Sequence, residues 1–581
     1  MTNFLNKETL VSFKQKVVSA INSFSIKETA LFFFLSVVFL ASLAGIIWKV
    51  SDSFMIPVPA SGGEITEGVI GAPRFINPLL AISDADRDIA ALVYSGLLRG
   101  SSDGSLIPDL ASKYDVSEDG RIYTFTIRDD AYFHNGDKVT ADDVIFTILK
   151  AQDSALKSPK RANWEGVSVE KINDQEVKFT LKQAYSPFLE NATLGILPKN
   201  VWKEAGSEQF SFSEFNVLPI GSGPYKINKV KKNSSGVPSY YELSSFKKFV
   251  LGAPYINKII IRFYPNEEAL FNAYKKKEIE GINAIPPDFA ISLKNDGVRI
   301  ESAPLPRIFG IFWNQNQANI FTDKAVRQAL DILVDKDAII EKVIHGYGVK
   351  IEGPIPKGGI GYESVQEKSL SAEERIEGAK KILTTGGWKF NDKTSRWEKK
   401  VKKETRVLEF SISTGEAPEL KDAAQVVKEN WAMAGIKVEV KVFETGDLNQ
   451  NVIRPRKYDA LLFGEIIGRD SDPFAFWHSS QRLDPGLNIA LYTNIKADKL
   501  LEEARTTNDT AKRAEKYSLF QKEVRSDVPA IFLYSPEFIY VVPEKINGLE
   551  VGFITVPSER FLDVYKWFVE TNKVWKIFAK N

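Results

Sequence analysis

The stretch YTFTIRDDAYFHNGDKVTADDVIFTI, residues 123–148, joins a strand pattern to a helix pattern. Its first part alternates apolar and polar side chains, which predicts a strand over residues 121–128. Thr140 then stands at the N-cap position of a predicted helix, because two aspartates follow it in the first turn, where the helix dipole favours negative charge. A strand followed closely by a helix indicates a mixed α/β or α+β fold.

The same two patterns recur along the rest of the chain. Alternating apolar and polar residues predict strands over residues 176–181, 258–264, 436–443 and 458–464. Apolar residues at helical spacing predict helices that begin at Thr322 and Asp335, and another over residues 420–431. The chain has 581 residues, which is enough for several domains, and the interruptions between these segments suggest more than one lobe.

The overall composition argues against several classes of protein. Apolar residues make up 44% of the chain and charged residues 26%, which is typical of a globular protein. The net charge of +1 argues against a nucleic-acid partner. There is no cysteine, and the three histidines, His134, His345 and His478, are far apart in sequence. We therefore expect neither a bound metal nor another cofactor.

The common catalytic motifs do not occur in the sequence. There is no phosphate-binding loop, no G-x-S-x-G nucleophile elbow and no H-E-x-x-H motif. Ser222 has no histidine near it in sequence. Asp470 and Asp472 could serve as the acid and base of a hydrolase, but an Asp-Pro pair such as Asp472-Pro473 is more typical of a turn. We expect no catalytic residue and interpret the protein as a binding protein.

The N-terminal region predicts attachment to a membrane. Residues Thr29–Trp48 carry no charge, and twenty helical residues span about 30 Å, the thickness of the bilayer core. More lysines precede this run than follow it, which places the N-terminus in the cytoplasm and the main body outside the cell membrane. We expect a cytoplasmic segment over residues 1–28, a single transmembrane helix over 29–48 and a Ser/Pro/Gly-rich linker over 49–63.

A cleaved signal peptide is the alternative to an anchor. Ser42-Leu43-Ala44 could serve as a small-x-small cleavage site, but the apolar run continues beyond it to Trp48. Leu43-Ala44-Gly45 also looks like a lipoprotein box in which Ile46 replaces the lipidated cysteine. At the other end, we interpret residues 572–581 as a frayed basic tail or, alternatively, a contact with the membrane surface.

Several short motifs then follow one another in the order found in one protein family. Besides residues 123–148, they are IPDLASKY (107–114), PIGSGPYKI (219–227), DKAVRQALD (323–331), GPIPKG (353–358), AKKILTTGGW (379–388), WAMAGIKVEV (431–440), DPFAFWHSSQ (472–481) and VPAIFLYSP (528–536). With them the chain resembles the family 5 extracellular solute-binding proteins, the oligopeptide- and dipeptide-binding components of ABC importers. Tyr114 stands where the family usually has tryptophan.

The resemblance implies a two-lobed, periplasmic-binding-protein-like fold with an extra small inserted domain. Its lobes close on a solute, with crossings between them near residues 303–308 and 530–536. The implied divisions are lobe I (64–96, 214–303 and 534–571), the inserted domain (97–213), lobe III (304–533) and the tail (572–581). The implied partners are a peptide or similar small solute and the permease and ATPase subunits of an importer, with the chain itself a monomer.

A loop with two aspartates is the expected wall of the cleft. The expected ligand-binding residues are Trp313, Glu465, Arg469, Asp470, Asp472 and Trp477. Peptide binders of the family commonly carry an aspartate where this chain has Arg469, and Asp470 follows one residue later. Either Arg469 binds an anionic solute, or Asp470 binds the ammonium of a peptide, or Arg469 is a structurally paired side chain. The aromatic residues of the loop could equally belong to the core.

These observations predict an extracytoplasmic substrate-binding protein that delivers its solute to an ABC permease. Two alternatives use the same fold. A ligand sensor would signal through the N-terminal helix, but about 28 cytoplasmic residues are too short for an output domain. A surface hydrolase would need an acid–base or nucleophile pair within about 3 Å.

Overall fold

The computed structural model describes residues 12, 14–19, 23–470 without 365–368, and 472–578. Two compact units divide these residues. One holds the residues up to Ala60 together with those from Glu570 onward, and the other holds Ser61–Val569.

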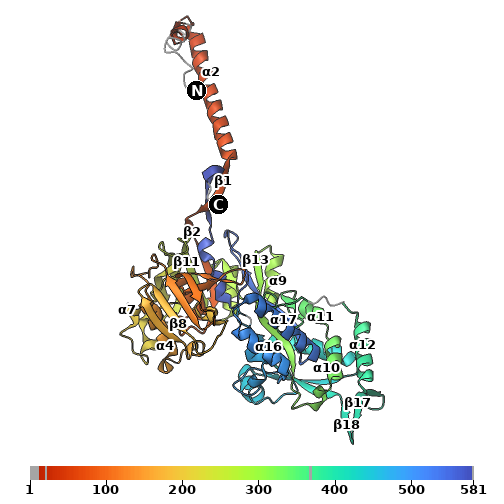
Figure 1. Cartoon of the computed structure of the whole chain (residues 1–581). Helices are drawn as coiled ribbons and strands as arrows, with labels where there is room; N and C mark the ends of the chain where they lie inside the picture. The colour runs from red at the N-terminus through yellow and green to blue at the C-terminus, as the bar shows by residue number, and fades with distance from the viewer. Residues whose placement is uncertain (1–11, 13, 20–22, 365–368, 471, 579–581) are drawn as a thin grey trace. The chain divides into compact units, whose positions relative to one another are not determined.

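The first unit consists of a long helix and a two-stranded ribbon (Figure 1). Helix α2 (Ile26–Ser53) contains the predicted apolar run and buries none of its residues. Strand β1 (Met55–Ala60) pairs with β23 (Glu570–Trp575) in antiparallel register, from Met55 opposite Trp575 to Ala60 opposite Glu570. Part of the expected linker and of the expected frayed tail is thus a ribbon, because each segment satisfies the backbone groups of the other.

In the second unit one large mixed sheet dominates. Among the described residues it has twelve strands, and β13 (Ile300–Pro304) and β15 (Gly348–Lys350) pair with its strand β22. The other strands, in spatial order, are β20 (Lys437–Phe443), β19 (Glu409–Gly415), β21 (Ala460–Ile466), β14 (Arg307–Trp313), β22 (Ala530–Val541), β12 (Gly281–Asn283), β2 (Gly62–Ile70), β11 (Ile256–Tyr264), β10 (Pro238–Ser245) and β9 (Tyr225–Lys232).

Smaller sheets and helices complete this unit. The smaller sheets are β5 (Ala111–Val116), β6 (Ile122–Ile127), β8 (Glu176–Thr180) and β7 (Ser168–Asn173); β3 (Leu98–Gly100) and β4 (Leu106–Pro108); and β16 (Lys389–Asn391), β17 (Arg396–Val401) and β18 (Glu404–Val407). The longer helices are α3 (Asp84–Val93), α4 (Ala141–Gln152), α8 (Glu267–Lys275), α9 (Pro287–Asn295), α10 (Lys324–Leu333), α11 (Lys336–Val343), α12 (Ala372–Thr385), α13 (Pro418–Met433), α16 (Ile495–Thr506) and α17 (Thr510–Asp527). The short ones are α5 (Arg161–Trp164), α6 (Phe188–Asn191), α7 (Lys199–Trp202), α14 (Thr445–Asp447) and α15 (Phe474–Trp477).

Strand β22 is shared by two parts of the sheet. Its first half pairs with β14, and its second half pairs with β13, where Ile300 lies opposite Val541. Ser535 lies between the two halves, and its hydroxyl is 2.6 Å from the carbonyl oxygen of Leu305 and 2.7 Å from that of Arg307. The chain therefore passes from β13 to β14 beside the middle of β22. That these segments are crossings between lobes stays a prediction.

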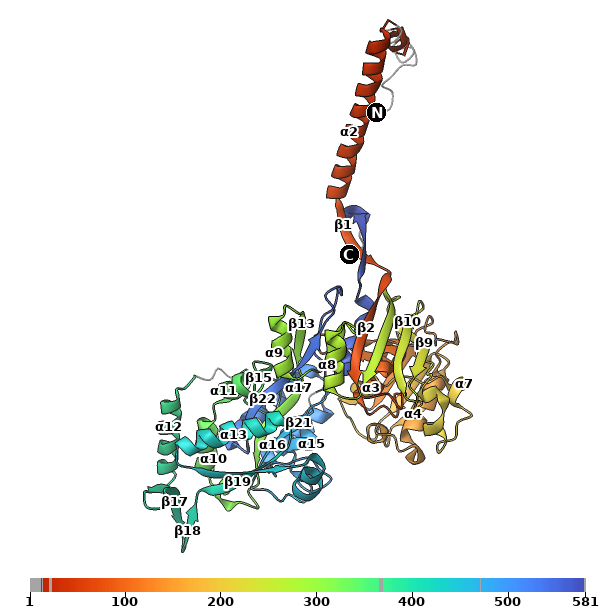
Figure 2. The same ribbon diagram turned by 180° about the vertical axis from the view of Figure 1, so that it is seen from behind.

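The buried apolar residues gather on both faces of the sheet. On the β14–β21–β22 part, one cluster contains residues of α10, α11 and α13, and a second contains residues of α16 and α17 on the other face (Figure 2). The largest cluster combines β2, β11, α3 and α4 with β6 and β8. A small one lies under α8 and α9. The division into lobe I, the inserted domain and lobe III stays a prediction.

The opening stretch of sequence folds as predicted. β6 buries Tyr123, Phe125 and Ile127, and Thr140 is the N-cap of α4 in a capping box with Asp143. The Thr140 hydroxyl donates to an Asp143 carboxylate oxygen at 2.8 Å. The predicted strands near residues 176, 258, 436 and 458 are confirmed as β8, β11, β20 and β21. Asp335 is confirmed as the cap of α11, whereas α10 is capped by Asp323, one residue after the predicted Thr322, which lies in a 3₁₀ turn.

Two of the family-like motifs meet at His134. Its Nε2 is 3.0 Å from the carbonyl oxygen of Gly223, and its Nδ1 faces the Gly221 N–H at 3.4 Å. Burial lowers the pKa of His134 to about 4, so the ring is neutral and its Nε2–H donates. Both glycines are needed here, because a Cβ at either position would come within 3 Å of the Val93 backbone.

A buried ionic cluster connects the first strand and helix of this unit to a turn near its C-terminal end. Arg560, in the 3₁₀ turn η7 (Pro557–Phe561), is fully buried and lies 2.6 Å from Glu67 of β2 and 2.7 Å from Asp88 of α3. Tyr540 of β22 donates its hydroxyl to Glu67 at 3.1 Å. Because removal of one partner would leave a buried charge unpaired, we expect this cluster to be essential for folding.

Candidate functional site

A cavity lies where several segments of the second unit converge. Its volume is about 550 Å³, which is within the usual range of roughly 300–1,000 Å³ for small-molecule sites. One wall consists of α3 and residues 94–100, a second of α5 and α6, a third of residues 555–562, and the last of Gly468 and Arg469 from the loop after β21. Its walls therefore include residues expected in lobe I, in the inserted domain and in lobe III.

Charged side chains line this cavity. They are the cations Arg87, Arg99, Lys160 and Arg469 and the anions Asp109, Glu190 and Glu559. Arg99 and Asp109 are both buried and lie 3.9 Å apart. Lys160 is exposed to solvent, and its ammonium forms no ion pair or hydrogen bond among the residues that the structure describes. Although the residue is accessible, its ammonium lies against the cavity walls, and the resulting partial loss of hydration, together with nearby Arg87, lowers the pKa of Lys160, whereas Glu190 and Glu559 raise it.

Arg469 is the expected site residue that lines the cavity, and it is paired. Its Nη2 is 2.7 Å from Glu559, and its guanidinium lies over the ring of Phe553 at 5.3 Å. Gly100 makes room for it, because a Cβ there would lie 2.6 Å from the guanidinium carbon. The backbone N–H of Arg469 donates to Glu190 at 3.0 Å. These contacts fix the loop after β21 against residues expected in lobe I and in the inserted domain.

The two aspartates of the loop are also paired. Asp470 forms an ion pair with Arg513 of α17, and Asp472 lies 2.7 Å from Arg505 of α16. Burial raises the pKa of Asp470 to about 6, although Arg513 opposes this shift. Asp472 also accepts the N–H of Phe474 at 3.1 Å, as expected for a turn. Their roles as ligand-binding residues stay predictions, and neither carboxylate lines the cavity.

The remaining predicted site residues lie in the core. Glu465 of β21 is buried, and burial raises the pKa of its carboxyl well above the usual range. Trp477 is fully buried between Phe312 and Phe532. Trp313 is fully buried in the cluster on the other face of the sheet. The sequence predicted that these three residues belong to the ligand-binding cleft. In the part of the chain that the structure describes, none of the three lines the cavity.

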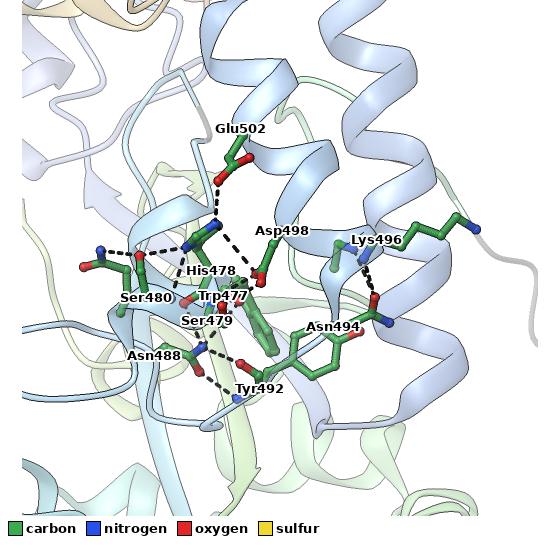
Figure 3. Close-up of polar contacts among 12 residues, drawn as sticks. Trp477, His478, Ser479, Ser480, Asn488, Tyr492, Asn494, Lys496, Asp498 and Glu502 are labelled. Atoms are coloured by element: carbon green, nitrogen blue, oxygen red, sulfur yellow. Dashed lines mark hydrogen bonds and ion pairs between the residues drawn. The ribbon is translucent and has the colours of Figure 1, made fainter.

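His478, next to this wall, is held in a dense polar cluster (Figure 3). Its Nδ1 accepts the N–H of Ser480 at 3.1 Å and lies 2.7 Å from the hydroxyl of the same residue. Its Nε2 lies 3.3 Å from Glu502. The row of serine, histidine and carboxylate is similar to a hydrolase triad, but here the histidine caps a 3₁₀ turn and does not line the cavity. Within the cluster, His478 thus serves as the N-cap of the 3₁₀ turn η6 (Ser479–Gln481).

Sequence reasoning missed most residues of the cavity. Arg87, Lys160, Glu190 and Glu559 come from four separate segments, and none belongs to a recognisable catalytic or binding motif. The one local signal is the basic run KSPKR, residues 157–161, which ends at the first residue of α5. Such a run is usually a solvated surface, so only the fold identifies Lys160 as a cavity residue.

Comparison with known proteins agrees with this architecture. Residues 105–487 match the model of the bacterial extracellular solute-binding proteins, family 5 Middle. The oligopeptide-binding protein AppA of Bacillus subtilis (strain 168) is 28% identical over 518 residues, which cover 88% of this chain and 92% of that protein.

Solved structures share the fold as well. AppA from Bacillus subtilis in complex with a nonapeptide matches with a TM-score of 0.65 at 27% identity and covers 88% of this chain and 100% of the other. NikZ from Campylobacter jejuni in complex with Ni(L-His) matches with a TM-score of 0.66 at 27% identity and covers 87% of this chain and 99% of the other. The fold is thus a mixed α/β periplasmic-binding-protein fold, and the chain belongs to the family 5 bacterial extracellular solute-binding proteins.

Proposed function

We propose that this chain captures a short peptide or a similar small solute in the cavity beside Arg469 and delivers it to the permease and ATPase subunits of an ABC importer. The observation that carries the proposal is a cavity of about 550 Å³ whose walls come from segments expected in different lobes. Such a site can close around a solute and release it when the lobes separate. The related proteins that bind peptides support a peptide as the solute.

The proposed solute carries an anionic group, such as the carboxylate of a peptide, that faces Lys160. Arg469 is already neutralised by Glu559 at 2.7 Å, and Arg99 is close to Asp109. The Lys160 ammonium has no such partner among the described residues and lines the same cavity. An anion is therefore the group that best complements this wall.

The proposed location is the outer side of the cell membrane, with α2 as a single-pass anchor and the N-terminus in the cytoplasm. Helix α2 is long and apolar enough to cross a bilayer, and none of its residues is buried in the protein. A signal sequence would have the same features. N-terminal sequencing of the cell-bound protein separates the two, because cleavage would expose Gly45 as the first residue.

Native mass spectrometry of the full chain tests the function. Protein extracted from membranes in mild detergent is expected to carry a small solute that is released intact on unfolding. Addition of that solute to depleted protein is then expected to raise the melting temperature by mass action. A protein that carries no solute, and that no member of a library of short peptides stabilises, would refute the proposal. Recovery of a cleaved solute would instead favour a hydrolase.

A further inference from the structure

Strand β23 runs back toward the end of α2. Strand β1 starts two residues after the helix, and β23 is antiparallel to it, so β23 approaches the helix as the chain proceeds. Trp575 lies opposite Met55, and the N–H of Lys576 donates to the carbonyl oxygen of Phe54 at 2.9 Å. The 3₁₀ turn η9 (Lys576–Phe578) follows directly. The end of the described chain therefore lies beside the end of the apolar helix.

Large apolar side chains are exposed at this point. We call them the juxtamembrane patch, and its members are Phe54, Trp575, Ile577 and Phe578. Their exposed fractions range from 43% for Trp575 to 77% for Ile577. The rings of Phe54 and Trp575 are stacked with centroids 6.5 Å apart. In water, such a group of exposed aromatic residues is unfavourable and marks a surface that binds something apolar.

The patch lies at the level of the lipid headgroups if α2 spans the membrane. The apolar run ends at Trp48, and the five residues Lys49–Ser53 add about 7.5 Å of helix at about 1.5 Å per residue. The headgroup layer is roughly 5–8 Å thick on each side of the bilayer core. Phe54 follows directly, at the outer edge of this layer, so its ring and those of the residues beside it can reach the layer, which tryptophan and other amphipathic aromatic residues prefer.

The charges beside the patch fit the same environment. Lys49 and Lys576 flank it, and long basic side chains favour the headgroup layer, where their stems cover apolar surface and their ammonium groups stay hydrated. Lys573, which precedes the patch on β23, is instead paired with Asp52 at 2.6 Å. The pattern of exposed aromatic residues with adjacent lysines is the one found in interfacial anchors.

We infer that the juxtamembrane patch inserts into the headgroup layer of the outer leaflet, so that the segment after β23 is a second membrane contact beside α2. The partner is the phospholipid bilayer. This inference rests on the proposed transmembrane role of α2. Because Ser61–Val569 is continuous with β1 at one end and β23 at the other, the solute-binding unit is then tethered by two paired strands.

Site-directed spin labelling tests the inference, since the chain has no native cysteine. The full chain is reconstituted into phospholipid vesicles with a nitroxide at Ile577→Cys, and collisions with oxygen and with a water-soluble nickel chelate give the depth of the label. The matched control is Ile495→Cys, the same residue type at 87% exposure in the other unit. Val38→Cys, in the middle of the apolar run, reports on α2 itself. Unchanged thermal unfolding shows that each variant is folded.

The expected order of depth is Val38 in the hydrocarbon, Ile577 in the headgroup layer and Ile495 in water. A label at Ile577 that is as accessible to the nickel chelate as the one at Ile495, while the label at Val38 is protected, overturns the inference and leaves the anchor intact. A label at Val38 that is in water overturns the anchor and the inference with it.

Discussion

In the proposed site, Lys160 is the cation that faces an anionic solute, because Arg99 and Arg469 have carboxylates close by and Arg87 lies 3.7 Å from Asp84. We expect Lys160→Met to weaken the binding of a solute with a free carboxylate. A charge-assisted hydrogen bond contributes about 1.5–3 kcal/mol, which corresponds to roughly a ten- to hundredfold change in affinity. Calorimetry with the recovered solute and with its amidated derivative measures the effect, which should be small for the amide.

The control for this substitution is Lys199→Met. Lys199 belongs to α7, and its ammonium pairs with Asp142 at 3.2 Å, away from the cavity. The change in charge and length is the same, so affinity should be preserved. Equal losses in both variants, or no loss in Lys160→Met, would contradict the assigned role of Lys160.

Asp470 should make stability depend on pH in a defined direction. Its pKa is raised to about 6 in the folded protein, against about 3.9 in an unfolded chain. The folded state therefore keeps this proton to a higher pH, and the free energy of unfolding falls as the pH rises from about 4 to about 6. Asp470→Asn removes this contribution, which is on the order of 2–3 kcal/mol at about 1.36 kcal/mol per pKa unit.

Urea unfolding of both proteins across this pH range measures the effect. The readout is the difference between them, because other buried carboxyls such as Glu465 and Glu559 also have raised pKa values and are shared by both proteins. Parallel pH profiles for wild type and Asp470→Asn would show that Asp470 does not titrate in this range.

The sequence located the loop around Arg469 but not the state of its charges. The aspartates and the arginine of this loop stand in one short stretch of sequence. Their partners come from distant elements: Arg505 from α16, Arg513 from α17 and Glu559 from the 3₁₀ turn η7. Neither periodicity nor a motif links such distant positions. The aromatic residues of the same stretch could be cavity or core by composition alone, and packing places Trp477 in the core.

Among the elements, strand β22 joins the two parts of the sheet, and the Ser535 hydroxyl holds the segment between β13 and β14 against its middle. The Ser535 hydroxyl is within hydrogen-bonding distance of the carbonyl oxygens of both Leu305 and Arg307, at 2.6 and 2.7 Å, and is buried. We expect Ser535→Ala to lower the free energy of unfolding by about 1–3 kcal/mol, because the buried hydrogen bond that the hydroxyl donates to one of these carbonyls is lost. Ser292→Ala, at an exposed serine that also donates to a carbonyl, should change it little.

Denaturant titration of both serine variants gives the comparison. If Ser535→Ala proves as stable as wild type, the crossing is held by the strand pairing alone and the hydroxyl is dispensable.

Strands with strict alternation were predictable, and the ribbon of β1 and β23 was not. Residues 436–443 alternate cleanly, so β20 follows from the local sequence. The segment MIPVPA of β1 contains two prolines, which favour a linker interpretation. Pro57 and Pro59 are two residues apart and remove donors from the same edge, so the other edge can still pair with β23. That partner lies at the far end of the chain and cannot be found from local patterns.

At the scale of the whole molecule, the ion pair of Arg469 and Glu559 should report on closure. The two residues come from segments expected in different lobes, so separation of the lobes has to break their contact at 2.7 Å. We expect Arg469→Ala to weaken solute binding about ten- to hundredfold whatever the charge of the solute, because it removes a contact of the closed form. Glu559→Gln should have a smaller effect in the same direction.

A double-mutant cycle of these variants, followed by calorimetry and by solution scattering, tests the idea. Solute should reduce the radius of gyration of the wild type more than that of Arg469→Ala. Additive effects on affinity, together with equal changes in radius, would mean that the pair does not depend on closure.

The position of β22 also has a consequence for how the protein is made. The strand completes the sheet on both sides of the crossing, and Arg560, which neutralises Glu67 and Asp88, lies 493 positions after Glu67. During synthesis and export, therefore, neither part of the sheet can be completed until the last tenth of the chain has emerged. A chain cut short before β22 would therefore leave both parts of the sheet with an unpaired edge, which favours association between chains.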